Sequence, residues 1–118
     1  MKTILVVDDE EAIMEMVCIF LEGEGYKTVQ ATNGQQGFDS LATTHPDLVI
    51  CDVMMPVLDG REMCRRMQAH SDYRSIPVIL MSAAIKSFSQ SELSHAILLD
   101  KPFDLDKLLH TVQKVIQE

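Results

Sequence analysis

The side chains of this sequence that could do chemistry share one position, at or just after the end of a short apolar run. They comprise three acids, one hydroxyl and one amine: Asp8, Asp9, Asp52, Ser82 and Lys101. Carboxylates that converge in a small space repel one another, which raises their pKa values unless a cation compensates. A convergent set of this kind therefore calls for a bound metal ion.

The type of the metal follows from the ligands on offer. Carboxylate oxygens suit a hard ion, and magnesium commonly takes one or two carboxylates while keeping several waters. The four histidines are scattered without the spacing of imidazole ligands, at His45, His70, His95 and His110. We therefore predict Mg²⁺ rather than zinc, and we expect the histidines at the surface.

Each candidate also has an ordinary structural explanation when it is taken alone. Asp8 and Asp9 could cap a helix, and Asp52 could cap a loop. Ser82 could be a turn residue and Lys101 a surface lysine. Their common placement at the ends of successive predicted strands is what indicates a site.

Five short runs predict the strands that would hold these residues: Ile4–Val7, Lys27–Ala31, Leu48–Cys51, Val78–Met81 and Ala96–Leu99. Apolar residues at helical spacing separate or follow them, around Ile13 to Leu21, Phe38 to Ala42, Met63 to Met67 and Leu105 to Ile116. The serine-rich stretch Ser87–Ser94 predicts a weak fourth helix. The pattern is (βα)5.

This alternation predicts the α/β class. Strands that are apolar throughout are typical of parallel sheets covered by helices on both faces, which indicates a doubly wound sandwich. In such sheets ligands bind beyond the carboxyl ends of the strands, where the strand order reverses. The chemical residues named above are expected to meet at that edge.

The motifs resemble those of the receiver domains of bacterial two-component systems, and the resemblance covers the whole chain. It is carried by the pair Asp8–Asp9, the segment Asp52–Gly60, Ser82–Ala83 and Lys101–Phe103. It implies a flavodoxin-like five-stranded parallel sheet in the order 2-1-3-4-5. It also implies that residues 1–118 form a single receiver domain.

The resemblance implies a role for each residue of the site. Asp52 would accept a phosphoryl group from the phosphohistidine of a partner kinase or phosphotransfer protein. Asp9, Asp52 and the backbone carbonyl of Met54 would bind Mg²⁺, with Asp8 holding it through a water. The remaining contacts, those to the phosphoryl oxygens, would come from Ser82 and Lys101. The chain would then be a phosphoacceptor with slow autodephosphorylation rather than an enzyme.

Several positions are expected to modulate this activity: Ala83, Ala84, Leu98 and Pro102. Leu98 stands where most members of the family place the aromatic residue that turns inward on activation. Because Leu98 lacks a ring and Ser87–Ser94 is rich in poor helix formers, we expect activation to reorder the predicted fourth helix without an aromatic rotation. The surface that this helix forms with the fifth strand and last helix should change with it. The stretch between Ser82 and Lys101 is also shorter than is usual in the family. Pro102 follows Lys101 at the family's cis peptide position.

Composition narrows the remaining possibilities. The net charge of −8 argues against direct binding of nucleic acid or anionic lipid. No apolar run is long enough to span a bilayer, and Cys18, Cys51 and Cys64 are expected to be free, buried thiols. We therefore expect a cytoplasmic protein. The basic residues Arg61, Arg65 and Arg66 are interpreted as a solvated helix face.

Three other functions share parts of this pattern. A degenerate receiver used only for docking would keep the fold without the phosphorylation. A haloacid-dehalogenase-type phosphatase also uses an aspartyl phosphate, but its nucleophile follows the first strand in an Asp-x-Asp pattern. A flavodoxin would need a phosphate-binding first loop, where Asp8 and Asp9 would repel the phosphate.

Overall fold

The computed structural model describes residues 1–82 and 96–116, in which strands and helices alternate along the chain. The elements are β1 (Thr3–Val7), α1 (Glu11–Gly23), β2 (Lys27–Ala31), α2 (Gly34–Thr44), β3 (Leu48–Asp52), α3 (Gly60–Gln68), β4 (Val78–Ser82), β5 (Ile97–Asp100) and α5 (Leu105–Ile116). The predicted alternation is confirmed for these elements. The predicted helix at Ser87–Ser94 lies outside the described residues.

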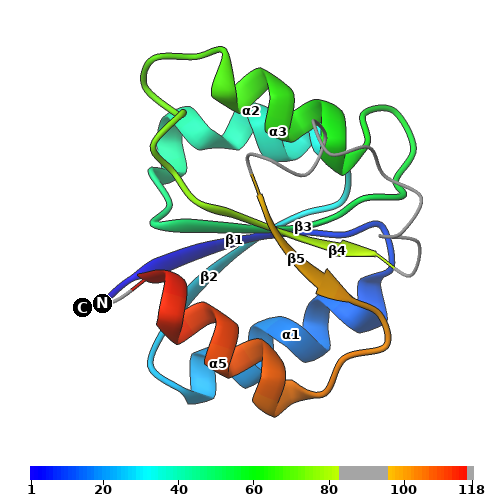
Figure 1. The fold of residues 1–118 in the computed structure, drawn as a ribbon, viewed down its shortest axis with the longest axis vertical. Coiled ribbons are helices and arrows are strands. Elements are labelled where there is room, and N and C mark those ends of the chain that lie inside the picture. The colour runs from blue at the N-terminus through cyan, green and yellow to red at the C-terminus, as the bar shows by residue number, and fades with distance from the viewer. Residues whose placement is uncertain (83–95, 117–118) are drawn as a thin grey trace.

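The five strands form one sheet in the order β2-β1-β3-β4-β5, and all neighbouring pairs are parallel. Helices α1 and α5 cover one face, while α2 and α3 cover the other (Figure 1). Each face has its own apolar core, so successive residues of a central strand enter opposite cores. This double covering explains why β3 and β4 are buried at every position.

The strand ends differ slightly from the sequence-based prediction. β3 and β4 each continue by one polar residue, because Asp52 pairs with Met81 and Ser82 pairs with Asp100 in the ladder. β5 begins at Ile97 rather than at Ala96. The apolar runs marked the strands, and pairing with a neighbour decided where each one stops.

Two helices on the same face begin at side chains that cap them. The Asn33 side chain accepts a hydrogen bond from the backbone N–H of Gln36 at 2.8 Å, and Asp59 accepts one from that of Glu62 at 3.0 Å. These bonds satisfy backbone donors that a helix start leaves without partners. Asn33 thereby fixes the start of α2, ahead of the apolar residues Phe38 to Ala42 that indicated this helix in the sequence.

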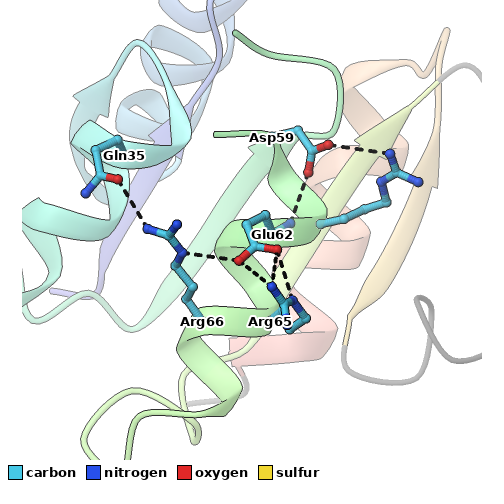
Figure 2. A network of polar contacts seen from close by, with 6 residues as sticks. Gln35, Asp59, Glu62, Arg65 and Arg66 are labelled. Atoms are coloured by element: carbon cyan, nitrogen blue, oxygen red, sulfur yellow. Dashed lines mark hydrogen bonds and ion pairs between the residues drawn. The ribbon is translucent and has the colours of Figure 1, made fainter. Parts of the chain in front are cut away.

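The basic residues of α3 form ion pairs on the helix surface, as Figure 2 shows. Glu62 pairs with Arg65 and Arg66, at 2.6 Å and 3.2 Å, and Arg61 pairs with Asp59 at 3.4 Å. Arg66 also donates to Gln35 of α2 at 3.2 Å, which links the two helices. The interpretation as a solvated helix face is confirmed for Arg65 and Arg66, which are exposed, whereas Arg61 is half-buried.

The remaining predictions about the surface and the core concern histidines, cysteines and the membrane. His45, His70 and His110 are exposed, while His95 lies outside the described residues. All three cysteines lie in the described ranges, where they are buried and belong to no disulfide, as predicted. Within residues 1–82 and 96–116, no helix is long and apolar enough to cross a membrane.

Candidate functional site

Three polar side chains are buried at the carboxyl end of the sheet. Among the described residues, the buried polar or charged side chains are those of Asp8, Asp52 and Ser82, with relative exposures of 0%, 4% and 2%. Asp8 follows β1, while the other two residues end β3 and β4. Because β1, β3 and β4 are neighbours in the sheet, the fold brings these residues to one edge, as predicted.

Lys101 reaches this edge from the end of β5. Its backbone N–H donates to the carbonyl of Ser82 at 2.9 Å, which fixes the start of the loop beside β4. Its ammonium Nζ lies 3.3 Å from Asp52 Oδ1 and 3.9 Å from Asp8 Oδ2. The side chain is 18% exposed, so this cation is largely withdrawn from water.

Glu10 also belongs to the acidic cluster, although it was not among the site residues predicted from the sequence. One carboxylate oxygen each from Asp8, Glu10 and Asp52 lie within 4.8 Å of one another. Lys101 Nζ lies 3.9 Å from Glu10 Oε1. The only signal in the sequence was its position directly after the acidic pair, which is also the position of an ordinary helix start.

Asp9 is exposed and lies outside that group of three. Its charge is nevertheless close enough to raise the pKa of Asp52. The structure therefore brings together Asp8, Asp52, Ser82 and Lys101, adds Glu10, and leaves Asp9 at the rim. The direct binding of a metal by Asp9 stays a prediction.

Burial raises the pKa values of the two buried acids, and repulsion from a neighbouring carboxylate adds to the rise in each. Burial is the largest cause for Asp8, whose pKa rises from 3.8 to about 6, with Asp52 adding repulsion. The pKa of Asp52 is also raised, chiefly by burial, while Lys101 opposes the rise. The predicted direction is thus confirmed, but removal from water contributes more than the repulsion on which the prediction was based.

The geometry of the cluster fits a divalent cation. Asp8 Oδ1 accepts a hydrogen bond from the backbone N–H of Glu10 at 2.9 Å, whereas the buried Asp8 Oδ2 accepts none. A buried acceptor without a hydrogen bond costs free energy that a bound ion or its water can recover. Hard oxygen donors that outnumber the single ammonium are the donor set that magnesium prefers.

The loop between β3 and α3 holds the backbone of Asp52 in place. The N–H of Gly60 donates to the carbonyl of Val53 at 3.0 Å. A Cβ added at Gly60 would collide with the carbonyl oxygen of Asp52, so only glycine allows this close approach. Met54, two residues after Asp52, is in contrast 67% exposed.

The predicted modulating residues divide into described and undescribed positions. Leu98 is half-buried and packs against the core under α2 and α3. The Lys101–Pro102 peptide bond is cis, as the resemblance implied. Ala83 and Ala84 lie outside the described residues.

Known proteins resemble this chain in sequence and in fold. The model of the response regulator receiver domain family matches residues 4–113. Sporulation initiation phosphotransferase F of Bacillus subtilis is 36% identical over 118 residues, which cover 98% of this chain and 94% of that protein. The DNA-binding dual master transcriptional regulator RpaA of a Synechocystis species is 32% identical over 123 residues, 99% of this chain and 50% of RpaA.

Solved structures have the same fold. The response regulator TrrA of Thermotoga maritima, solved in complex with Mg(2+)-BeF, superposes with a TM-score of 0.88 and 33% identity. That match covers 98% of this chain and 99% of TrrA. By contrast, the chain spans about half the length of several curated relatives that it matches.

Proposed function

The chain belongs to the response regulator receiver domain family, and on that premise we propose that it accepts a phosphoryl group on Asp52 from the phosphohistidine of a partner protein. The observation that carries this proposal is the ion pair of 3.3 Å between the buried Asp52 carboxylate and Lys101. A buried carboxylate can act as a nucleophile toward phosphorus. A cation beside it can then compensate the negative charge of the phosphoryl group that it receives. Asp52 has both features.

The chemical step forms one bond and breaks one. A carboxylate oxygen of Asp52 attacks the phosphorus in line, the P–N bond to the imidazole breaks, and its electron pair stays on the imidazole nitrogen. The product is an acyl phosphate on Asp52. Phosphoryl transfer needs little from the protein beyond in-line positioning and neutralisation of oxygen charge.

The residues present divide this work between them. Lys101 would make a charge-assisted contact with a phosphoryl oxygen, and the Ser82 hydroxyl would donate a hydrogen bond to another. Asp9, Asp52 and the backbone carbonyl of Met54 would hold Mg²⁺, with Asp8 behind a water. When bound, Mg²⁺ supplies positive charge to the phosphoryl oxygens.

We further propose that residues 1–118 act as a single receiver domain in the cytoplasm, with a sensor histidine kinase or phosphotransfer protein as the donor. Three buried cysteines that belong to no disulfide suit a reducing compartment. The net charge of −8 does not favour nucleic acid, so any DNA-binding output would come from another chain or domain. We expect phosphorylation to change the surface of β5, α5 and the predicted fourth helix, which lies outside the described residues.

A small donor with a P–N bond, such as phosphoramidate, tests the proposal. We expect Mg²⁺-dependent modification that tandem mass spectrometry of proteolytic peptides assigns to Asp52. The variant Asp52→Asn should stay unmodified, with Asp47→Asn, a change at an exposed acid at the opposite end of β3, as the matched control. A label on another residue would refute the assignment. A parent that takes no label from any donor would favour the docking module instead.

A further inference from the structure

Glu10 brings an additional carboxylate to the cluster, and the acidic-pair motif gives it no role. Its Oε atom lies within 4.8 Å of the carboxylate oxygens of Asp8 and Asp52, and 3.9 Å from Lys101 Nζ. The side chain is 59% exposed, so it lies at the mouth of the buried pair rather than within it. From there it can reach an ion that also contacts the buried acids.

The helix that begins after Glu10 does not use this carboxylate. Glu10 is the N-cap residue of α1, with extended backbone angles, yet its side chain makes no capping hydrogen bond. A capping side chain at this position would stabilise the helix, and the Glu10 carboxylate provides no such cap. The carboxylate faces Lys101 instead.

Glu10 also orients Asp8 through its backbone. The N–H of Glu10 donates to Asp8 Oδ1 at 2.9 Å, and the other oxygen, Oδ2, lies 3.9 Å from Lys101 Nζ. That Oδ2 is fully buried and accepts no hydrogen bond. A buried carboxylate oxygen whose cationic neighbour lies beyond hydrogen-bond distance is short of positive charge, which a bound cation would supply.

Lys101 Nζ marks where positive charge is stabilised in this cluster. It contacts one oxygen of each of the three acids, at 3.3 Å from Asp52 and 3.9 Å from both Asp8 and Glu10. One ammonium cannot neutralise three carboxylates, so the cluster keeps an excess of negative charge. A divalent ion would supply the missing charge.

We propose that Glu10 is a member of the divalent-cation site, where its carboxylate strengthens ion binding together with Asp8 and Asp52. This inference rests on the magnesium site of the proposed function and assigns to it a residue that the motif does not include. An acidic side chain at the rim lowers the free energy of the bound ion by direct attraction, or by accepting a hydrogen bond from one of its waters. Neither effect requires the phosphoryl group.

The test is magnesium titration of the full chain by isothermal calorimetry at constant ionic strength. Glu10→Gln should raise the dissociation constant of Mg²⁺ by roughly threefold to tenfold. Glu11→Gln is the matched control, because it removes the same charge from the next residue, which is exposed and lies outside the group of three. We expect its dissociation constant to stay within about twofold of the parent value.

Each alternative outcome has a distinct meaning. If Glu10→Gln binds Mg²⁺ as tightly as the parent, or if both variants weaken binding equally, Glu10 is not part of the site and the inference is wrong. If the parent itself shows no saturable binding, the magnesium site of the proposed function fails as well. Circular dichroism of the metal-free variants checks that each one is folded.

Discussion

At the scale of single residues, the site depends on charges that the fold holds away from water. Asp8 has no exposed surface, and its raised pKa means that the folded protein binds its proton more tightly than the unfolded chain does. Between pH 3.8 and about 6, the folded state therefore holds more protons. It follows that this group lowers the free energy of unfolding as pH rises through that window.

Asp8→Asn should remove the destabilisation that the ionised Asp8 carboxylate causes in the metal-free protein. We expect the free energy of unfolding at pH 7.5 to rise by roughly 1–3 kcal/mol, because a neutral amide replaces a buried charge. At pH 3.5, where the Asp8 carboxyl is protonated in the folded protein, the gain should disappear. Urea denaturation in EDTA at both pH values measures it. A variant less stable than the parent at pH 7.5 would show that Lys101 already compensates the charge of Asp8.

Met54 should control how long the phosphoryl group persists. The side chain is 67% exposed, so it does not pack into the loop, and its thioether cannot orient a water for hydrolysis. Met54→Asn should therefore speed loss of phosphate from Asp52 by roughly threefold to tenfold. The double variant with Ala84→Glu, whose position lies outside the described residues, should be faster still.

The lifetime is measured as the decay of the phosphorylated mass after the donor is removed. Met16→Asn, on the exposed face of α1, is the matched control and should decay at the parent rate. Equal rates for Met54→Asn and the parent, with phosphorylation intact, would show that the side chain of residue 54 does not orient the attacking water.

The sequence predicted the buried members of the site better than its rim. Asp8, Asp52, Ser82 and Lys101 stand at or after strand ends, and parallel strands bring such positions to one edge. The place of Glu10 in the acidic cluster could not be predicted in this way, because it depends on the direction of a side chain at the start of a helix. The exposure of Asp9, next to a fully buried Asp8, likewise depends on the turn that follows β1.

At the scale of elements, the position of Asp52 depends on how closely the start of α3 approaches the end of β3. Gly60→Ala would put a Cβ against the carbonyl oxygen of Asp52 and 3.1 Å from Leu80 Cδ2. We expect it to lower the free energy of unfolding by about 1–3 kcal/mol. It should also slow phosphorylation, because the strand end must move.

Gly23→Ala is the control for that experiment. Gly23 ends α1, and a Cβ there meets no atom within 4 Å. Its stability should be unchanged or raised by up to about 1 kcal/mol, and its phosphorylation should match the parent. Urea denaturation and donor-driven labelling compare the variants, and a Gly60→Ala variant that behaves like Gly23→Ala would contradict the close approach.

The elements themselves were largely predictable, and their limits were not. β3 and β4 read as strands because both of their faces are covered, while β2 and β5 lie at the edges and carry exposed positions. Apolar runs mark the buried part of a strand, whereas the polar residues Asp52 and Ser82 join it only through pairing with a neighbour. Sequence periodicity carries no information about such pairing.

At the scale of the whole molecule, the excess negative charge at one edge of the sheet should make the fold responsive to magnesium. Ion at a hundred times its dissociation constant stabilises a protein by about 2.7 kcal/mol if it binds only the folded state. The melting temperature should rise over millimolar Mg²⁺ in the parent. Asp9→Ala should remove most of this rise, while Asp39→Ala, an exposed acid on α2, should keep it. A parent whose melting temperature does not change would argue against a metal site.

The proposed phosphorylation requires Asp52 as the phosphoacceptor of a magnesium-dependent site, and intact-mass spectrometry with acetyl phosphate is its sharpest test. With Mg²⁺ we expect one added phosphoryl group per chain, which hydroxylamine removes because the bond is an acyl phosphate. With EDTA, or in Asp52→Asn, the added mass should be absent. A label that forms equally well in Asp52→Asn, or one that resists hydroxylamine, would show that Asp52 is not the phosphoacceptor.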